Sequence, residues 1–301
     1  MTVVVALGGN ALIRAGESGS AAEEHANLER TCHALAPLLA EPRIVITHGN
    51  GPQVGNELLR HERAAGEVPP LPLHVVVAQT QAEIGSLLEQ ELATVASRPV
   101  VCVLTHVRVD PHDAAFGTPS KPIGLFYRDE EAPELARRRG WTMTDVGQGW
   151  RRVVPSPRPL EIVELASIRT LVERGDIVVA CGGGGIPVVS EEGRLRGADA
   201  VVDKDLASAL LAQRLGASRL VILTDVAAVY RGFGGRDAAE IRELDLAAAE
   251  ALAATLAPGS MRPKVEAAAS FVRSTGGTAL IASPETLDEA LAGRSGTRVA
   301  K

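Results

Sequence analysis

The chain is poor in cysteine, aromatic residues and lysine, and it has no long apolar run. Its cysteines, Cys32, Cys102 and Cys181, form no C-x-x-C pair, which argues against a disulfide framework and fits a reducing compartment. The net charge of −6 argues against nucleic acid or an anionic membrane as a partner, because phosphate surfaces require a basic footprint. No apolar run approaches the roughly 20 residues of a membrane span, and no basic signal region follows Met1. We therefore expect a cytoplasmic protein with no nucleic-acid or membrane partner.

Motifs of several enzyme classes are also missing. The chain has no GxxxxGK[ST] string of a P-loop enzyme, no HRD or DFG string of a protein kinase and no GxSxG nucleophile elbow. The glycine run 182–185 lacks the GxGxxG pattern of a dinucleotide fold. His106 and His112 lie near Asp110 and Asp113, but no further ligand accompanies them, so a polar loop is favoured over a metal site.

Lysine is rare but not randomly placed. Only four lysines stand against 27 arginines, and three of them, Lys121, Lys204 and Lys264, lie in loop-like segments rich in glycine and proline. A lysine ammonium is a compact, rotatable charge that can follow a moving phosphoryl group, whereas the arginine fork suits a fixed anion. Chance would explain any one of them, but for all three a role in phosphate chemistry is the better interpretation.

The apolar pattern predicts an α/β fold. Short β-branched runs end in glycine or polar turns and give way to helical patterns, which is typical of a largely parallel sheet covered by helices on both sides. The expected strands are residues 3–7, 43–47, 99–104, 176–180, 219–223 and 278–281. The expected helices include residues 22–39, 80–92 and 160–173. Because ligands bind beyond the carboxyl ends of parallel strands, the glycine turns mark the expected site.

Composition also predicts how the chain is divided. Residues 121–159 carry charge clusters, both tryptophans and a proline-rich exit, so we expect a small protruding subdomain there. It would separate an N-terminal lobe, residues 1–120, from a C-terminal lobe, residues 160–301.

Two of the lysines lie at predicted helix starts. Asp203 is a suitable N-cap for a helix that begins at Lys204 and stops at Gly216, and Ser260 is suitable for the helix that carries Lys264. A cation in the first turn is disfavoured by the helix dipole unless an anion is bound there. Both placements therefore indicate an anion site.

Nine segments together resemble the carbamate kinases of the amino acid kinase family. They run in order along nearly the whole chain, and THGNGPQVG and GWRRVVPSP are the most specific of them. The segments are residues 6–12, 47–55, 78–81, 120–124, 149–157, 182–189, 202–205, 223–226 and 259–264.

The resemblance implies a three-layer αβα sandwich with a mainly parallel sheet, and reversible phosphoryl transfer between carbamoyl phosphate and ADP, giving ATP and carbamate. It also implies Mg²⁺ carried with ATP or ADP, a homodimer and a link to arginine metabolism. The implied catalytic residues are Lys121, Lys204, Asp205 and Lys264. The implied substrate-binding residues are Gly8, Gly9, Asn10, Gly49, Asn50 and Gly51, and the implied nucleotide-binding residues are Gly182, Gly183, Thr224, Asp225, Tyr230, Ser260 and Met261.

The chain departs from the family pattern at four positions. Arg262 and Val77 stand where glycine is usual, His74 replaces an aspartate and Leu125 replaces a proline. Arg262 is closest to the expected nucleotide site, so it bears on affinity or loop motion more than on chemistry. Two alternatives remain open: an enzyme of the same fold that acts on another small carboxylate, and a silent nucleotide-binding homologue.

Overall fold

A computed structural model describes residues 1–9, 12–14, 17, 19–147, 149–235, 237–256 and 261–301. Its centre is an eight-stranded sheet in the order β15-β17-β16-β12-β1-β2-β9-β3, in which only the β16–β17 pairing is antiparallel. The strands are β1 (Thr2–Leu7), β2 (Arg43–His48), β3 (Val100–Cys102), β9 (Ile177–Val179), β12 (Arg219–Leu223), β15 (Glu243–Asp245), β16 (Thr278–Ala282) and β17 (Thr297–Ala300). The predicted, mainly parallel sheet is confirmed.

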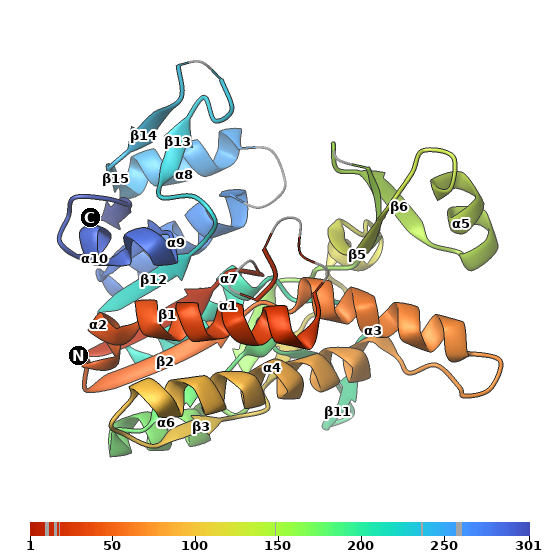
Figure 1. Ribbon diagram of the computed structural model, residues 1–301, viewed down its shortest axis with the longest axis horizontal. Coiled ribbons are helices and arrows are strands. Elements are labelled where there is room, and N and C mark those ends of the chain that lie inside the picture. Colours follow the sequence, from red (N-terminus) through yellow and green to blue (C-terminus); the bar gives the residue numbers. More distant parts are fainter. Residues whose placement is uncertain (10–11, 15–16, 18, 148, 236, 257–260) are drawn as a thin grey trace.

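Helices cover both faces of this sheet (Figure 1). Successive residues of β1 alternate between two cores: Val4 belongs to the core beneath α6, α7, α8 and α9, and Val5 to the core beneath α1, α4 and α10. The three-layer sandwich follows from this alternation, because each strand side chain points to the face opposite its neighbour's. The helices are α1 (Ala21–Ala34), α2 (Ala36–Leu39), α3 (Gly51–Ala64), α4 (Leu73–Val95), α6 (Leu165–Arg174), α7 (Lys204–Leu215), α8 (Leu246–Thr255), α9 (Met261–Thr275) and α10 (Leu287–Leu291).

Two smaller sheets lie beside the sandwich. One is four-stranded, in the order β11-β10-β4-β8, and the other is the hairpin of β13 and β14. Their strands are β4 (His106–Val109), β8 (Pro159–Ile162), β10 (Ile186–Glu191), β11 (Arg194–Gly197), β13 (Val229–Arg231) and β14 (Ala239–Ile241). Among the residues described, no helix is long and apolar enough to cross a bilayer.

The segment after residue 120 forms a separate three-stranded antiparallel sheet with one helix. It contains β5 (Lys121–Tyr127), α5 (Ala132–Arg139), β6 (Thr142–Asp145) and β7 (Trp150–Val154), and Figure 1 shows it standing away from the sandwich. It contacts the main body where β5 crosses α3, and the backbones meet closely there: a Cβ atom on Gly55 would lie 2.0 Å from the Cα atom of Gly124.

Three predicted helices differ from the structure. The helix expected at 160–173 begins only at Leu165, because the preceding residues form β8 and pair with β4. The helix expected at 22–39 is divided at Leu35, with Pro37 in the first turn of α2, where its missing N–H is tolerated. The helix expected at 80–92 is longer and spans α4.

Candidate functional site

Two glycine turns meet at the carboxyl ends of neighbouring strands. Gly49 follows β2, and a Cβ atom there would lie 3.5 Å from both the backbone N of Gly9 and a side-chain carbon of Lys204. Gly8 follows β1 and is more tightly placed, because its Cβ atom would lie 2.9 Å from the carbonyl oxygen of Leu223 at the end of β12. Backbone N–H groups in such turns can face an approaching anion, although that of Gly49 itself donates to the carbonyl oxygen of Leu7 at 3.1 Å.

A third glycine run packs against the turn after β2. A Cβ atom on Gly183 would lie 2.1 Å from Nδ2 of Asn50, and its φ of +65° also favours glycine. Asn50 itself is buried and donates from Nδ2 to the hydroxyl of Thr80 at 2.9 Å. Gly182 and Gly183, expected to bind nucleotide, therefore support the turn expected to bind substrate.

The start of α7 brings charged groups into this position. Asp203 is its N-cap, with Oδ1 accepting from the backbone N–H of Asp205 at 2.9 Å and of Leu206 at 3.3 Å. Gly216 ends the helix in the left-handed conformation, so both predicted helix ends are confirmed. The cap orients the first turn and fixes Lys204 beside the glycine turns.

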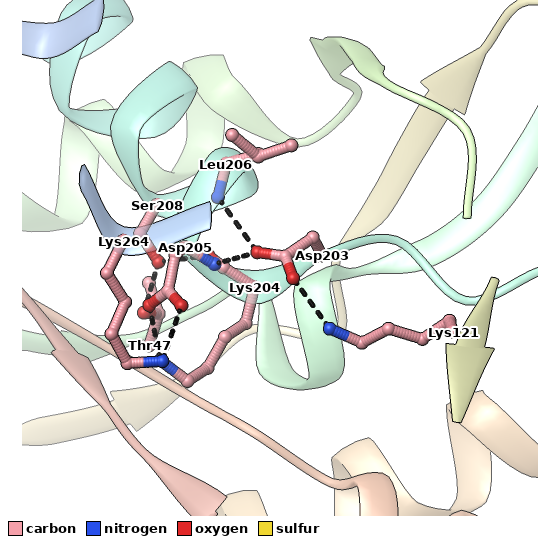
Figure 2. A network of polar contacts seen from close by, with 8 residues as sticks. All are labelled: Thr47, Lys121, Asp203, Lys204, Asp205, Leu206, Ser208 and Lys264. Atoms are coloured by element: carbon pink, nitrogen blue, oxygen red, sulfur yellow. Dashed lines mark hydrogen bonds and ion pairs between the residues drawn. The ribbon is translucent and has the colours of Figure 1, made fainter. Parts of the chain in front are cut away.

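Three ammonium groups converge on two carboxylates (Figure 2). Asp205 accepts from Nζ of Lys204 at 2.5 Å and from Nζ of Lys264 at 3.2 Å, while Oδ2 of Asp203 accepts from Nζ of Lys121 at 2.6 Å. The Lys204, Lys264 and Asp205 side chains are 11%, 9% and 3% exposed. The structure thus brings together the four residues expected to be catalytic, from β5, α7 and α9.

The charges in this cluster shift one another's proton affinity. Burial lowers the pKa of Lys204, and the nearby ammonium of Lys264 adds to this, although Asp205 opposes it. Burial acts to raise the pKa of Asp205, but Lys204 and Lys264 outweigh it and hold that pKa well below its usual range. Burial also opposes the charge on Lys121, yet its pKa is raised because Asp203 faces it directly. Asp205 therefore serves Lys204 and Lys264 as a fixed anion.

A buried hydroxyl pair ties β2 to α7. The hydroxyl of Ser208 donates to the carbonyl oxygen of Lys204 at 2.6 Å, so the hydroxyl of Thr47 must donate to Ser208 across the second 2.6 Å contact (Figure 2). Both side chains are buried. Sequence reasoning did not assign a role to either residue, although Thr47 stands directly before the glycine turn.

The side chains of His48 and Gln81 contact the backbone of the glycine turns. Nδ1 of His48 lies 2.9 Å from the carbonyl oxygen of Gly49, which can only accept, so Nδ1 carries the proton. The ring packs against Gly182, where a Cβ atom would lie 2.2 Å from Nε2. Gln81 donates to the carbonyl oxygen of Gly182 at 2.7 Å and accepts from the backbone N–H of Thr105 at 2.6 Å.

A cavity of about 210 Å³ adjoins the turn after β1, and Gly8 lines it. Thr224 and Asp225 line it, as does Leu223 at the end of β12. Tyr230 is not among its lining residues; it lies on β13, and its hydroxyl donates to Glu240 at 3.1 Å. The structure brings together only part of the expected nucleotide set at this cavity.

The rest of the expected set is spread along the chain. Met261 begins α9 and is half-buried against the core beneath that helix. Asn10 and Ser260 lie outside the described residues. His106 contacts Glu164 through its ring at 2.8 Å and its backbone N–H at 2.7 Å, and the described residues contain no cluster of three potential metal ligands.

Two of the unusual positions have clear partners. Arg262 donates from Nε to Glu266 at 2.8 Å, one turn further along α9. His74 lies 3.1 Å from Asp199, and its ring occupies the space that a Cβ atom on Gly197 would fill. Val77 is fully buried in α4, and Leu125 lies on β5.

The chain is similar in sequence and in structure to known proteins over nearly its whole length. The model of the amino acid kinase family matches residues 1–283. The chain is 48% identical to the carbamate kinase of Halobacterium salinarum, over 98% of this chain and 97% of that protein, and 43% identical to that of Pyrococcus furiosus, over 99% and 98%. It is also similar to the structure of carbamate kinase from Giardia lamblia bound to AMP-PNP, with a TM-score of 0.89 and 42% identity over 100% of this chain and 98% of that one.

Proposed function

Because the chain belongs to the carbamate kinases of the amino acid kinase family, we propose that it transfers a phosphoryl group reversibly between carbamoyl phosphate and ADP, giving ATP and carbamate. The observation that carries this proposal is the cluster of Lys121, Lys204 and Lys264, held by Asp203 and Asp205 beside the glycine turns. Phosphoryl transfer depends on positioning and on stabilising spread negative charge, and this cluster provides both.

The reaction needs no general base from the protein. In the direction of carbamoyl phosphate formation, a carbamate oxygen attacks the γ-phosphorus of ATP, and the bond to the bridging oxygen breaks with its electron pair leaving on ADP. Carbamate is already an anion, so no proton has to be removed. This agrees with the site, where Asp205 is engaged by Lys204 and Lys264 and the ring of His48 is buried.

We assign the lysines to different parts of the negative charge on the reacting phosphates. Lys204 lies against the turn at Gly49, so it would neutralise the equatorial oxygens of the transferring phosphoryl group. Lys264 and Lys121 approach from α9 and β5 and would contact the nucleotide side of the bridge. Asp205 would hold Lys204 and Lys264 in register. The amides of the turns after β1 and β2 would bind the carbamoyl group.

The substrates can be assigned to the predicted lobes. We propose that residues 1–120 form the carbamate lobe, residues 160–301 the nucleotide lobe and residues 121–159 the protruding subdomain that supplies Lys121. The nucleotide would occupy the cavity at Thr224 and Asp225. Mg²⁺ would enter as part of MgADP or MgATP, since it is usually held by phosphate oxygens, waters and few protein ligands. We further propose a cytoplasmic homodimer.

The test is ATP formation from carbamoyl phosphate and MgADP, followed with luciferase. Wild-type protein should form ATP, and Lys204→Ala should abolish this. Lys204→Arg keeps the charge but places a planar guanidinium against the turn at Gly49, so we expect kcat to fall by about 100-fold or more. Unchanged turnover in Lys204→Arg would refute the role given to Lys204.

The same assay separates the alternatives. Folded wild-type protein that binds ADP but forms no ATP would exclude the carbamate kinase reaction. A panel of other acyl phosphates would then distinguish an enzyme for another small carboxylate from a silent nucleotide-binding homologue.

A further inference from the structure

Asp203 uses its two oxygens for two different tasks. Oδ1 caps α7 by accepting from the backbone N–H of Asp205 and Leu206, and Oδ2 accepts from Nζ of Lys121 at 2.6 Å. The first contact is local in sequence, whereas the second spans 82 residues. A single, nearly buried carboxylate, 10% exposed, therefore joins the catalytic helix to the outlying sheet.

Lys121 needs such a tie more than the other two lysines do. Lys204 and Lys264 share Asp205 and are close to fully buried, but the side chain of Lys121 is 34% exposed. It also begins β5, in the small sheet that Figure 1 shows standing apart from the sandwich. A long, partly exposed lysine loses considerable rotamer freedom when it is fixed, so a partner that fixes it in advance matters.

We propose that Asp203 is a positioning residue, which holds Lys121 at the N-terminus of α7 so that its ammonium is in place before the nucleotide phosphates arrive. The cap aligns Lys204 and Asp205, and the same carboxylate aligns Lys121 with them. Asp203 acts through Lys121 and does not itself contact the reacting atoms. Its kinetic consequence rests on the proposed phosphoryl transfer, whereas its structural consequence does not.

The variant that separates the two tasks is Asp203→Asn. Asparagine caps a helix about as well as aspartate, so α7 should remain intact, but the neutral amide no longer holds the ammonium of Lys121 by charge. We expect kcat to fall between about tenfold and about 100-fold, with a smaller change in KM, because the lost alignment acts on the transition state. Serine is also a good N-cap residue, so Asp203→Ser can be used if the asparagine variant does not fold.

Asp245 provides a matched control. It caps α8 by accepting from the backbone N–H of Ala248 at 2.8 Å, and it lies on β15 at the edge of the main sheet. Asp245→Asn should leave kcat and KM at wild-type values. An equal fall in both variants would mean that changing a cap aspartate alone explains the effect, and it would overturn the proposal.

A double-mutant cycle with Lys121→Met decides whether Asp203 acts through Lys121. If it does, Asp203→Asn should cause no further loss of kcat once Lys121 is methionine. If the losses multiply, or if Asp203→Asn alone has wild-type kinetics, the proposal is wrong.

Hydrogen exchange gives a readout that does not depend on the reaction. Without nucleotide, Asp203→Asn and Lys121→Met should both speed amide exchange in β5, while exchange in α7 stays unchanged. Unchanged exchange in β5 would contradict the tie. If the variants exchange faster in β5 but the wild-type protein makes no ATP, the link between Asp203 and Lys121 is supported and the carbamate kinase reaction is rejected.

Discussion

Replacing His48 should remove one identifiable part of the protein's sensitivity to acid. Its ring is fully buried, and burial, with a smaller contribution from the charge of Lys204, lowers its pKa from 6.5 to about 4, although the hydrogen bond to Gly49 opposes the shift. The folded protein therefore keeps this ring neutral at pH values where the unfolded chain takes up a proton. Protonation of the unfolded chain favours unfolding as the pH falls from 6.5 towards 4.

The magnitude follows from that shift. Each pKa unit corresponds to about 1.4 kcal/mol, so a fall from 6.5 to about 4 lowers the free energy of unfolding by about 3 kcal/mol at pH 4. Three acids oppose this within the same window, since burial raises the pKa of Glu24, Glu62 and Glu83. A difference between wild type and a His48 variant cancels their contribution.

His48→Asn is the suitable variant, because an amide N–H can replace Nδ1 as donor to Gly49 but does not titrate. The assay is urea unfolding at pH 7, 6, 5 and 4, with His112→Asn measured beside it as the same replacement at an exposed position. His48→Asn should be less stable at pH 7, because it leaves a cavity, and most of that deficit should vanish by pH 4. Parallel stability curves for wild type and His48→Asn would refute the reasoning.

Two further predictions concern packing and charge. Asp205→Asn leaves two nearly buried ammonium groups without their shared carboxylate, so thermal unfolding should show that the free energy of unfolding falls by about 3–5 kcal/mol. Asp176→Asn is the control: its arginine partner is 65% exposed, so the free energy of unfolding should fall by less. Gly55→Ala would place its methyl group 2.0 Å from the Cα atom of Gly124, so urea unfolding should show a loss of about 1–3 kcal/mol. Gly66→Ala meets no heavy atom within 4 Å and is the control; equal stability of the two alanine variants would contradict this contact.

Local patterns predicted the fold where local and tertiary preferences agree. The runs at 3–7, 43–47 and 219–223 are apolar and β-branched, and all three became central parallel strands. The first turns of α4 were missed because Val75, Val76 and Val77 disfavour helix by their branching, and burial of that helix overrides the preference. Residues 160–162 became a strand because of their pairing with β4, which no local pattern reveals.

The candidate site was predictable to the extent that it is local. Asp203 was recognised as a cap, because capping depends on neighbours within three residues. Its pairing with Lys121 was not recognised, since 82 residues separate the partners and only the folded chain brings them together. The support that His48 and Gln81 give to Gly182 is likewise a product of tertiary packing.

The charge balance of the cluster explains why lysine was kept here while arginine serves elsewhere. Lysines outnumber aspartates three to two in this cluster, and the side chains of Lys204 and Lys264 are nearly buried, where a charge depends on the anions around it. Bound phosphoryl anions of the substrates would balance the positive charge of the lysines. A guanidinium would present its N–H donors in a fixed planar fork, which suits an anion that does not move. An ammonium can instead rotate from Asp203 or Asp205 to a phosphate oxygen as charge moves during transfer.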